Sequence, residues 1–265
     1  MKEMDINTIR KIQLEILIDV ANFCEKNNLR YFLSGGTLLG AIRHDGFIPW
    51  DDDIDIQMPR PDYENFIHSY NHEKFQVYCW DNDKDFLCTY AKVVNTDTIL
   101  IENCSFGKLL GVNIDVFPVD GLPSNEKKIK NIVFINKFLW GLVACATIND
   151  ISNRSKIKQI EISIIKSFYK IFPVKSYVTG KAIKMSKKYN FENSNKVATL
   201  VWGNGLKEVI NKSTATEYHK KSFEGNFFNI PDNYEDYLIN KYGDYMKLPP
   251  ENERIYKHDI KVYLK

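Results

Sequence analysis

The chain has 265 residues, which is long enough for a substantial core, and its hydrophobic (44%) and charged (26%) fractions are ordinary for a soluble globular protein. Its formal net charge of +2 argues against a dedicated nucleic-acid binder, which normally carries a strongly basic face. The five cysteines are odd in number and include no Cys-x-x-Cys pair, so we expect neither a zinc site nor a disulfide framework. Packed free thiols in a reducing compartment are the better interpretation.

The start of the chain does not resemble a signal peptide, because residues 1–5 lead into a charged, periodic segment. We therefore expect a cytoplasmic protein, with the inner face of the cell membrane as a second place of action. The longest apolar region, Ile132 to Ile148, contains Asn136 and Lys137 and falls short of the roughly 20 apolar residues of a spanning helix. It predicts a buried helix and no transmembrane segment, and peripheral contact with a membrane surface is the alternative.

The first predicted element is a helix over residues 6–26, where apolar residues recur at intervals of three and four. Asp5 and Thr8 are both suitable caps for its start. Arg30 to Leu33 then begins the first strand.

A glycine pair, Gly35-Gly36, follows this strand and allows the backbone to turn tightly and to approach a ligand closely. Thr37 to His44 predicts a short helix. Its N-terminus would face an incoming phosphate, because free backbone amides and the helix dipole favour negative charge there.

The stretch Asp51 to Ile56 is rich in carboxylates. If it is extended, Asp51, Asp53 and Asp55 share one face, and the two isoleucines point to the other. Like charges on one face repel one another, which favours a cation between them, and clustered carboxylates suit Mg²⁺ or Mn²⁺. A solvated acidic loop is the alternative. A calcium loop of EF-hand type is excluded, because Ile56 stands where that loop requires glycine.

A helix is predicted for Pro61 to Tyr70, and strands for Phe75 to Cys79 and Tyr90 to Val94. Thr98 to Ile101 is expected to continue the same sheet. Lys92 interrupts the apolar residues of the second strand. It could lie at a sheet edge, or it could contact a phosphate, for which lysine supplies a point charge.

A second informative string runs from Gly111 to Pro123, where Asp115 stands between Ile114 and Val116. An aspartate in such a run is unfavourable for a strand unless it is paired, so Asp115 is a candidate for a third carboxylate at a metal site. Asp120, which precedes a glycine, is interpreted as a turn residue.

The middle of the chain is predicted to be helical, over Lys127 to Ile148, Lys156 to Phe172 and Gly180 to Tyr189. The second helix has an apolar face, for which we expect packing against the protein in preference to a membrane surface. A strand at Lys196 to Val201 follows, and Asp232 is expected to cap a last helix.

Three parts of the sequence carry a resemblance to a known family. A Gly-Gly turn followed by a strand with Asp-x-Asp resembles the nucleotidyltransferase fold of polymerase-β type. The string Gly-Gly-Thr-Leu-Leu-Gly-Ala-Ile-Arg-His-Asp-Gly-Phe-Ile-Pro-Trp-Asp-Asp-Asp-Ile-Asp-Ile, more than twenty contiguous residues, resembles the LicD family, which includes the fukutin-related proteins. The string from Gly111 and the C-terminal block from Phe228 to Arg254, followed by His258, also look like this family.

The resemblance implies an α+β fold with a polymerase-β-like mixed sheet, flanking helices and a helical insertion. Because the middle helices are the unmatched part, we expect one catalytic unit over residues 1–265. Its core would be about 5–124 and 190–265, and the insertion about 125–189.

The resemblance also implies roles for the site residues. Asp53, Asp55 and Asp115 would be catalytic and, with Asp51, would hold two ions of Mg²⁺ or Mn²⁺. Gly35, Gly36 and Thr37 would hold a diphosphate, and Lys92 and Arg43 would add positive charge. For Arg43, pairing with Asp45 or with the acidic strand is an equal alternative.

The activity implied by the resemblance is transfer of a phospho-alcohol group. A nucleotide-activated alcohol, most typically CDP-choline, would be the donor, and a glycan hydroxyl, in some cases lipid-linked, would attack and release CMP. A choline cation would need aromatic faces, for which Trp50, Trp80 and Trp202 are candidates. One alternative is a nucleotidyltransferase that modifies a small molecule and releases pyrophosphate. Another is a binding protein without activity, whose sign would be a missing carboxylate.

Overall fold

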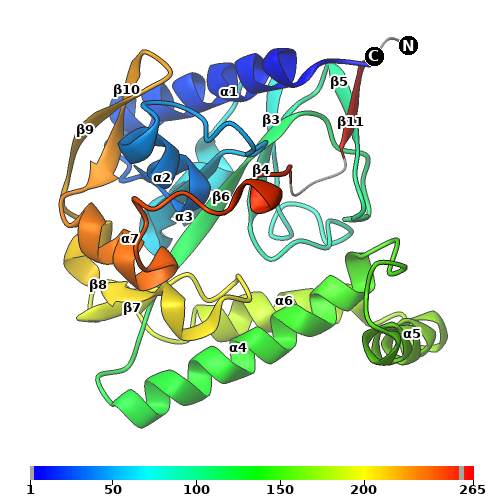
Figure 1. Ribbon diagram of the computed structural model, residues 1–265. Helices are drawn as coiled ribbons and strands as arrows, with labels where there is room; N and C mark the ends of the chain where they lie inside the picture. The colour runs from blue at the N-terminus through cyan, green and yellow to red at the C-terminus, as the bar shows by residue number, and fades with distance from the viewer. Residues whose placement is uncertain (1–2, 257–259) are drawn as a thin grey trace.

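The computed structural model describes residues 3–256 and 260–265, so His258 lies outside the described part of the chain. A mixed sheet occupies the centre of the molecule, with α1 above it and α4 below it in the view of Figure 1. The strands are β1 Phe32–Leu33, β2 Asp55–Pro59, β3 Phe75–Tyr78, β4 Ala91–Asn95, β5 Thr98–Ile101, β6 Asn113–Gly121, β7 Lys196–Ala198, β8 Val209–Asn211, β9 Tyr218–Phe223, β10 Asn226–Pro231 and β11 Lys261–Leu264.

The helices surround this sheet and extend below it (Figure 1). They are α1 Ile6–Lys26, α2 Gly35–Arg43, α3 Arg60–Ser69, α4 Glu126–Thr147, α5 Lys156–Ile171, α6 Lys175–Ser186 and α7 Tyr234–Tyr242, with 3₁₀ turns at Gly205–Glu208, Lys212–Ala215 and Glu251–Glu253. The predicted mixed sheet and the predicted helices at the start and middle of the chain are confirmed.

The main sheet has the order β1-β2-β6-β4-β3, and β7 and β8 extend it from β6. β2 and β6 are parallel, whereas β4 and β6 are antiparallel. The prediction that Thr98 to Ile101 continues this sheet is wrong, because β5 pairs with β11 in a separate two-stranded sheet. Central β6 is buried on both faces along its second half, as expected for a strand covered on both sides.

The acidic stretch differs from its predicted form. Only Asp55 lies in a strand, since β2 begins there, and residues 51–54 form a loop that leads into it. The three aspartates therefore do not share one face of a strand. Ile54 and Ile56 are nevertheless fully buried in the main core, as the alternation predicts.

The structure identifies the residues that cap the first and the last helix. At α1, the Asp5 carboxylate accepts hydrogen bonds from the amides of Asn7 and Thr8, so Asp5 is the cap. At α7 the prediction is wrong, because Asn233 is the N-cap residue. The Asp232 side chain instead pairs with His219 Nδ1 at 2.8 Å, in a contact between β9 and the end of β10.

Helices α4, α5 and α6 lie below the sheet, and α5 sits at one end of α4 (Figure 1). The prediction of a buried helix for residues 132–148 is wrong for most of α4, since only 28% of its most apolar stretch of 18 residues is buried. Within the described residues, α4 is long and apolar enough to cross a membrane by length and composition alone, a property that core helices of soluble proteins share.

The predicted packing of α5 is also wrong. Its expected core face, from Ile157 to Ile171, is exposed, and only Ile162 and Tyr169 are buried. α6 begins earlier than predicted, at Lys175. The division into a core and a helical insertion stays a prediction.

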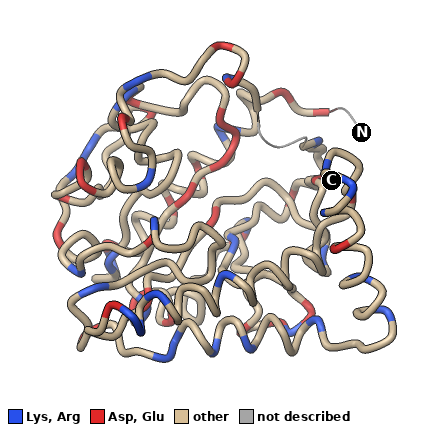
Figure 2. Tube along the Cα trace, turned by 60° about the horizontal axis from the view of Figure 1, so that its bottom comes forward, with Lys and Arg blue, Asp and Glu red and all other residues tan. Residues whose placement is uncertain are grey.

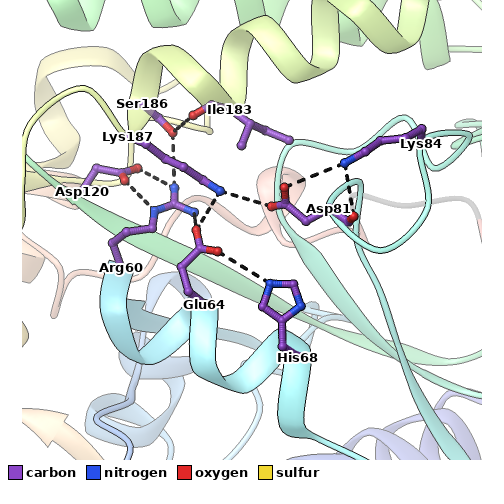
Figure 3. A network of polar contacts seen from close by, with 9 residues as sticks. All are labelled: Arg60, Glu64, His68, Asp81, Lys84, Asp120, Ile183, Ser186 and Lys187. Carbon is purple, nitrogen blue, oxygen red and sulfur yellow. Dashed lines mark hydrogen bonds and ion pairs between the residues drawn. The ribbon is translucent and has the colours of Figure 1, made fainter.

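A network of ion pairs fixes α6 to the core (Figure 3). Arg60, at the start of α3, donates to both carboxylate oxygens of Asp120, at 2.7 and 2.9 Å, and also to the Ser186 hydroxyl at 3.2 Å. Lys187 pairs with Glu64 at 2.7 Å. The interpretation of Asp120 as a turn residue is wrong, because it lies fully buried in β6 as the partner of Arg60.

Candidate active site

Three neighbouring strands carry a row of charged side chains. We call it the carboxylate row, and it consists of two aspartates, Asp55 and Asp115, and of Lys92 beside them. In the sheet register, Asp55 of β2 stands opposite Asp115 of β6, and Asp115 stands opposite Lys92 of β4. Neighbouring strands lie about 4.8 Å apart, so the register brings the three side chains together on one face. The flanking residues Ile114 and Val116 point the other way, into the main core.

Lys92 and Asp115 form an ion pair, with Lys92 Nζ at 2.6 Å from Asp115 Oδ1 and at 3.1 Å from Asn113 Oδ1. The edge position considered for Lys92 is wrong, because β4 lies between β3 and β6 and the side chain is buried. Burial by itself would lower the pKa of Lys92, but the adjacent Asp115 carboxylate outweighs it and the net shift is upward. The ammonium therefore stays charged and holds Asp115 in place.

The glycine pair at the start of α2 makes room for two carboxylates. Gly35 has a φ of +55°, and a Cβ on it would lie 2.7 Å from Asp55 Oδ2. A Cβ on Gly36 would lie 2.2 Å from Asp51 Oδ2. Both distances are shorter than non-bonded carbon–oxygen contacts allow, so only glycine lets these carboxylates approach the backbone at the helix N-terminus.

Helix α1 holds the acidic loop from the other side. Arg10 donates to three backbone carbonyls, those of Ile48 (3.1 Å), Pro49 (2.9 Å) and Asp51 (2.6 Å). Gln13 Nε2 donates to the carbonyl of Asp52 at 2.9 Å. These bonds fix the loop backbone, so the side chains of the loop are presented in a defined arrangement.

The acidic loop is suited to a divalent cation. One oxygen from each of Asp51, Asp52 and Asp53 lies within 4.8 Å of the other two, which is close enough for a shared ion. Asp55 lies next to this group. Burial, followed by the charges of Asp53 and Asp115, raises the pKa of Asp55 well above its usual value. A bound cation would lower the pKa of Asp55 again, because it favours the ionised carboxylate.

The carboxylate row and the acidic loop line one cavity of about 630 Å³. Its walls come from α1, the start of α2, β2, β4, β6, α4 and α7. The lining includes six aromatic side chains: Tyr90, Phe106, Phe117, Trp140, Trp202 and Tyr242. Three buried polar atoms of lining residues have no hydrogen-bond partner among the residues that the structure describes, namely Gln13 Oε1, Gln57 Oε1 and Thr199 Oγ1. Buried polar groups normally find a partner, so these atoms are available to a ligand, an ion or water.

Two expected ligand residues lie away from the cavity wall. The Thr37 hydroxyl accepts a hydrogen bond from the Asp55 amide at 2.8 Å, so it positions the first residue of β2. Arg43 lies at the far end of α2 and donates to the Tyr245 carbonyl at 2.9 Å and to His44. Asp45, considered as its partner, pairs with Lys221 instead. The structure thus brings Gly35, Gly36 and Lys92 to the cavity, but not Thr37 or Arg43.

Residues 28–140 match the family described as LicD/FKTN/FKRP, nucleotidyltransferase domain. The lipopolysaccharide cholinephosphotransferase LicD of Haemophilus influenzae is 29% identical over 271 residues, covering 100% of both chains. The match places a LicD-family domain over residues 28–140.

Shorter similarities point the same way. The human ribitol 5-phosphate transferase FKRP is 46% identical over 46 residues, which cover 17% of this chain and 9% of FKRP. An uncharacterised protein of Rickettsia typhi is 35% identical over 138 residues, covering 48% of this chain and 40% of that protein. Residues 28–140, which match the LicD/FKTN/FKRP family, contain both the carboxylate row and the acidic loop.

Several cavity residues lie outside the matched part, and two polar ones among them are not predicted from the sequence. Gln13 precedes it, and Lys241 of α7 follows it. Lys241 pairs with Glu208 at 3.0 Å and lies near Asp55. Burial would lower the pKa of Lys241, but nearby Tyr237 and Glu208 outweigh it and the net shift is upward. Their signal in the sequence is weak, because a polar residue on an amphipathic helix is usually solvated.

Gln57 and Asp52 are further cavity residues that the sequence pattern does not predict. Gln57 stands two positions after Asp55 on β2, so strand alternation places it on the same face. Asp52 belongs to the group of three close carboxylates. An extended strand would point Asp52 away from Asp51 and Asp53, whereas the observed loop does not.

Proposed function

We propose that this protein is a metal-dependent transferase that moves phosphocholine from CDP-choline to a hydroxyl of a cell-surface glycan or its lipid-linked precursor. Two relatives support the general class: one is named a cholinephosphotransferase of lipopolysaccharide, and the other a ribitol 5-phosphate transferase. Both names describe transfer of a phosphate-bearing alcohol. The observation in the structure that supports it best is the carboxylate row beside the acidic loop, in one cavity.

In this proposal the core is a nucleotidyltransferase-like catalytic unit. Asp51, Asp53 and Asp55, with Asp115, would hold Mg²⁺ or Mn²⁺, two ions in all. When bound, such ions neutralise phosphate charge and favour ionisation of the attacking hydroxyl. Three close oxygens in the loop, and the unpaired Gln13 and Gln57 oxygens in the same cavity, fit hard cations of this kind.

The chain's own residues would bind and orient the donor. The amides of Gly35 and Gly36 open helix α2, where the helix dipole favours a diphosphate. Lys92 and Lys241, both charged and both lining the cavity, would balance its negative charge. Lys92 would also keep the Asp115 carboxylate aimed at the reacting hydroxyl.

The aromatic lining fits a cationic alcohol. Trp202 has ring centroids of Tyr90, Phe117 and Trp140 at 5.7, 5.5 and 5.6 Å, and all four residues line the cavity. Aromatic faces attract a quaternary ammonium through their electron-rich centres. Of the three tryptophans considered from the sequence, Trp202 lines the cavity, whereas Trp50 and Trp80 do not.

The proposed step exchanges one phosphorus–oxygen bond for another. The glycan oxygen attacks the phosphorus that bears choline, and the bond from that phosphorus to the bridging oxygen of CMP breaks. The hydroxyl proton passes to a carboxylate of the row or to solvent, and CMP leaves. Charge neutralisation and in-line positioning are the main requirements of such a transfer.

The test supplies the purified protein with Mg²⁺ or Mn²⁺, a mixture of glycan acceptors and one donor at a time: CDP-choline, CDP-glycerol, CDP-ribitol or CTP. We expect CMP from CDP-choline, faster than from the two uncharged alcohols, and no pyrophosphate from CTP. CMP from CDP-ribitol alone would keep the transferase class and reject choline. Pyrophosphate from CTP, without turnover of any CDP-alcohol, would reject the proposal in favour of a nucleotidyltransferase.

A further inference from the structure

Helix α5 exposes an apolar stripe that nothing in the proposed reaction uses. We call it the α5 stripe: Ile157, Ile160, Ile164, Phe168 and Ile171, all at least half exposed. The helix packs on α4 through the opposite side, where Ile162 and Tyr169 are buried and the Tyr169 hydroxyl donates to the Leu142 carbonyl at 3.3 Å. Soluble proteins rarely leave a contiguous apolar face of this kind in water.

The segment around the α5 stripe is strongly basic. Residues 154–175 contain six Lys or Arg and one acidic residue, Glu161, whereas the whole chain has a net charge of only +2. Figure 2 shows Lys and Arg recurring along the lower edge of the molecule, where the middle helices lie. Lys156 and Lys170 are exposed. Lys156 stands one helical turn before Ile160 and so lies beside the apolar stripe, and Lys170 lies near the C-terminal end of the stripe. The aliphatic stems of both can reach toward the stripe while the ammonium groups remain in water.

The start of helix α5 lies close to the cavity. Arg154, two residues before α5, is part of the cavity lining, and so are Val143, Ala144 and Thr147 of the preceding helix. A surface that receives α5 would therefore lie near the cavity.

We propose that α5 docks this protein on an anionic lipid bilayer, with the α5 stripe in the headgroup region and the lysines at the phosphates. An amphipathic helix with a hydrophobic face and flanking lysines has the chemistry of an interfacial helix. A second copy of the chain fits less well, since a two-fold contact through this face would bring two basic segments together. Protein interfaces are also depleted in lysine at their centres.

The test is flotation of the full chain with vesicles, without donor or acceptor, so its result is independent of the proposed reaction. The vesicles contain phosphatidylcholine alone or phosphatidylcholine with phosphatidylglycerol. We expect wild type to float with the anionic vesicles, and added salt to weaken this binding. The variant Ile157→Ser/Ile160→Ser/Ile164→Ser, whose positions are 72, 60 and 66% exposed, should lose binding about tenfold or more.

A matched variant separates the α5 stripe from general surface hydrophobicity. Leu109→Ser/Phe227→Ser/Ile255→Ser changes positions that are 63, 67 and 65% exposed elsewhere, and it should bind vesicles as wild type does. Lys156→Gln/Lys170→Gln should weaken binding to anionic vesicles about tenfold or more. Circular dichroism checks that each variant is folded.

Three outcomes would overturn the proposal. The first is wild-type protein that fails to float with anionic vesicles. The second is a matched variant that loses binding as strongly as the variant in the α5 stripe. The third is a dimer in sedimentation equilibrium that the isoleucine substitutions dissociate, without any vesicle binding, which would make a second copy the occupant of this face.

Discussion

The cavity and helix α5 arrange polar and apolar side chains in opposite ways. Around the cavity, charged groups are buried or half-buried, and Asp115 is held by the buried Lys92. On α5, isoleucines are exposed and the charges beside them are solvated. Burying charge and exposing apolar surface both cost free energy, so each region is explained by something that the protein binds.

The strongest contrast in stability is between a buried ion pair and a surface ion pair. Asp120→Asn should lower the free energy of unfolding by about 3 kcal/mol or more, because Arg60 would lose its fully buried charged partner and, among the described residues, keep only Glu64, at 3.4 Å. Glu161→Gln removes an exposed ion pair with Lys158 on α5 and should change the free energy of unfolding by less than about 0.5 kcal/mol. Urea denaturation measures both. Equal effects of the two substitutions would contradict the contrast.

The two faces of α5 itself can be compared within one helix. Ile162→Ala removes a side chain that is 8% exposed and should cost about 2 to 4 kcal/mol of unfolding free energy. Ile164→Ala removes one that is 66% exposed and should change this free energy by less than about 0.5 kcal/mol, since alanine also favours the helix. Thermal unfolding in the absence of lipid gives both values. A large loss in the Ile164 variant would mean that the stripe is covered by protein.

The smallest expected change concerns a single methyl group. Gly36→Ala would force the Asp51 carboxylate to move and should lower turnover about 10- to 100-fold, because small displacements at a reacting centre are costly. Gly141→Ala is the matched control. A Cβ there meets no atom within 4 Å, and the substitution should stabilise α4 by about 0.5 to 1 kcal/mol without lowering turnover. Equal turnover in the two variants would show that close approach at Gly36 is not required.

Residue patterns predict much of the core. Strand alternation around Asp115 correctly places Ile114 and Val116 in the core, and the period of residues 6–26 correctly gives α1. The roles of Asp53, Asp55 and Asp115 in catalysis stay predictions. Partners distant in sequence are harder to foresee. The local sequence predicts a turn at Asp120, and only the tertiary structure brings Arg60 to its carboxylate.

The helices show the main limit of the sequence argument. A period of 3.6 residues shows that α5 has an apolar face, but it does not show whether protein, lipid or water covers that face. Gln57 and Lys241 illustrate the same limit in the cavity, because neither stands out among ordinary polar residues of a strand and a helix. The acidic stretch illustrates another, since its loop gathers Asp51, Asp52 and Asp53, whereas strand alternation would point Asp52 away from the other two.

The most direct test of the central claim, that the carboxylate row and the acidic loop perform the transfer, is CMP release by Asp55→Asn in the presence of Mg²⁺ and CDP-choline. We expect a loss of about 1,000-fold or more. The unfolding temperature without metal should be unchanged or higher, because burial and neighbouring charges raise the pKa of Asp55. Asp244→Asn, at an exposed position outside the cavity, should retain full turnover. Turnover within about tenfold of wild type in Asp55→Asn would contradict the assignment of the site.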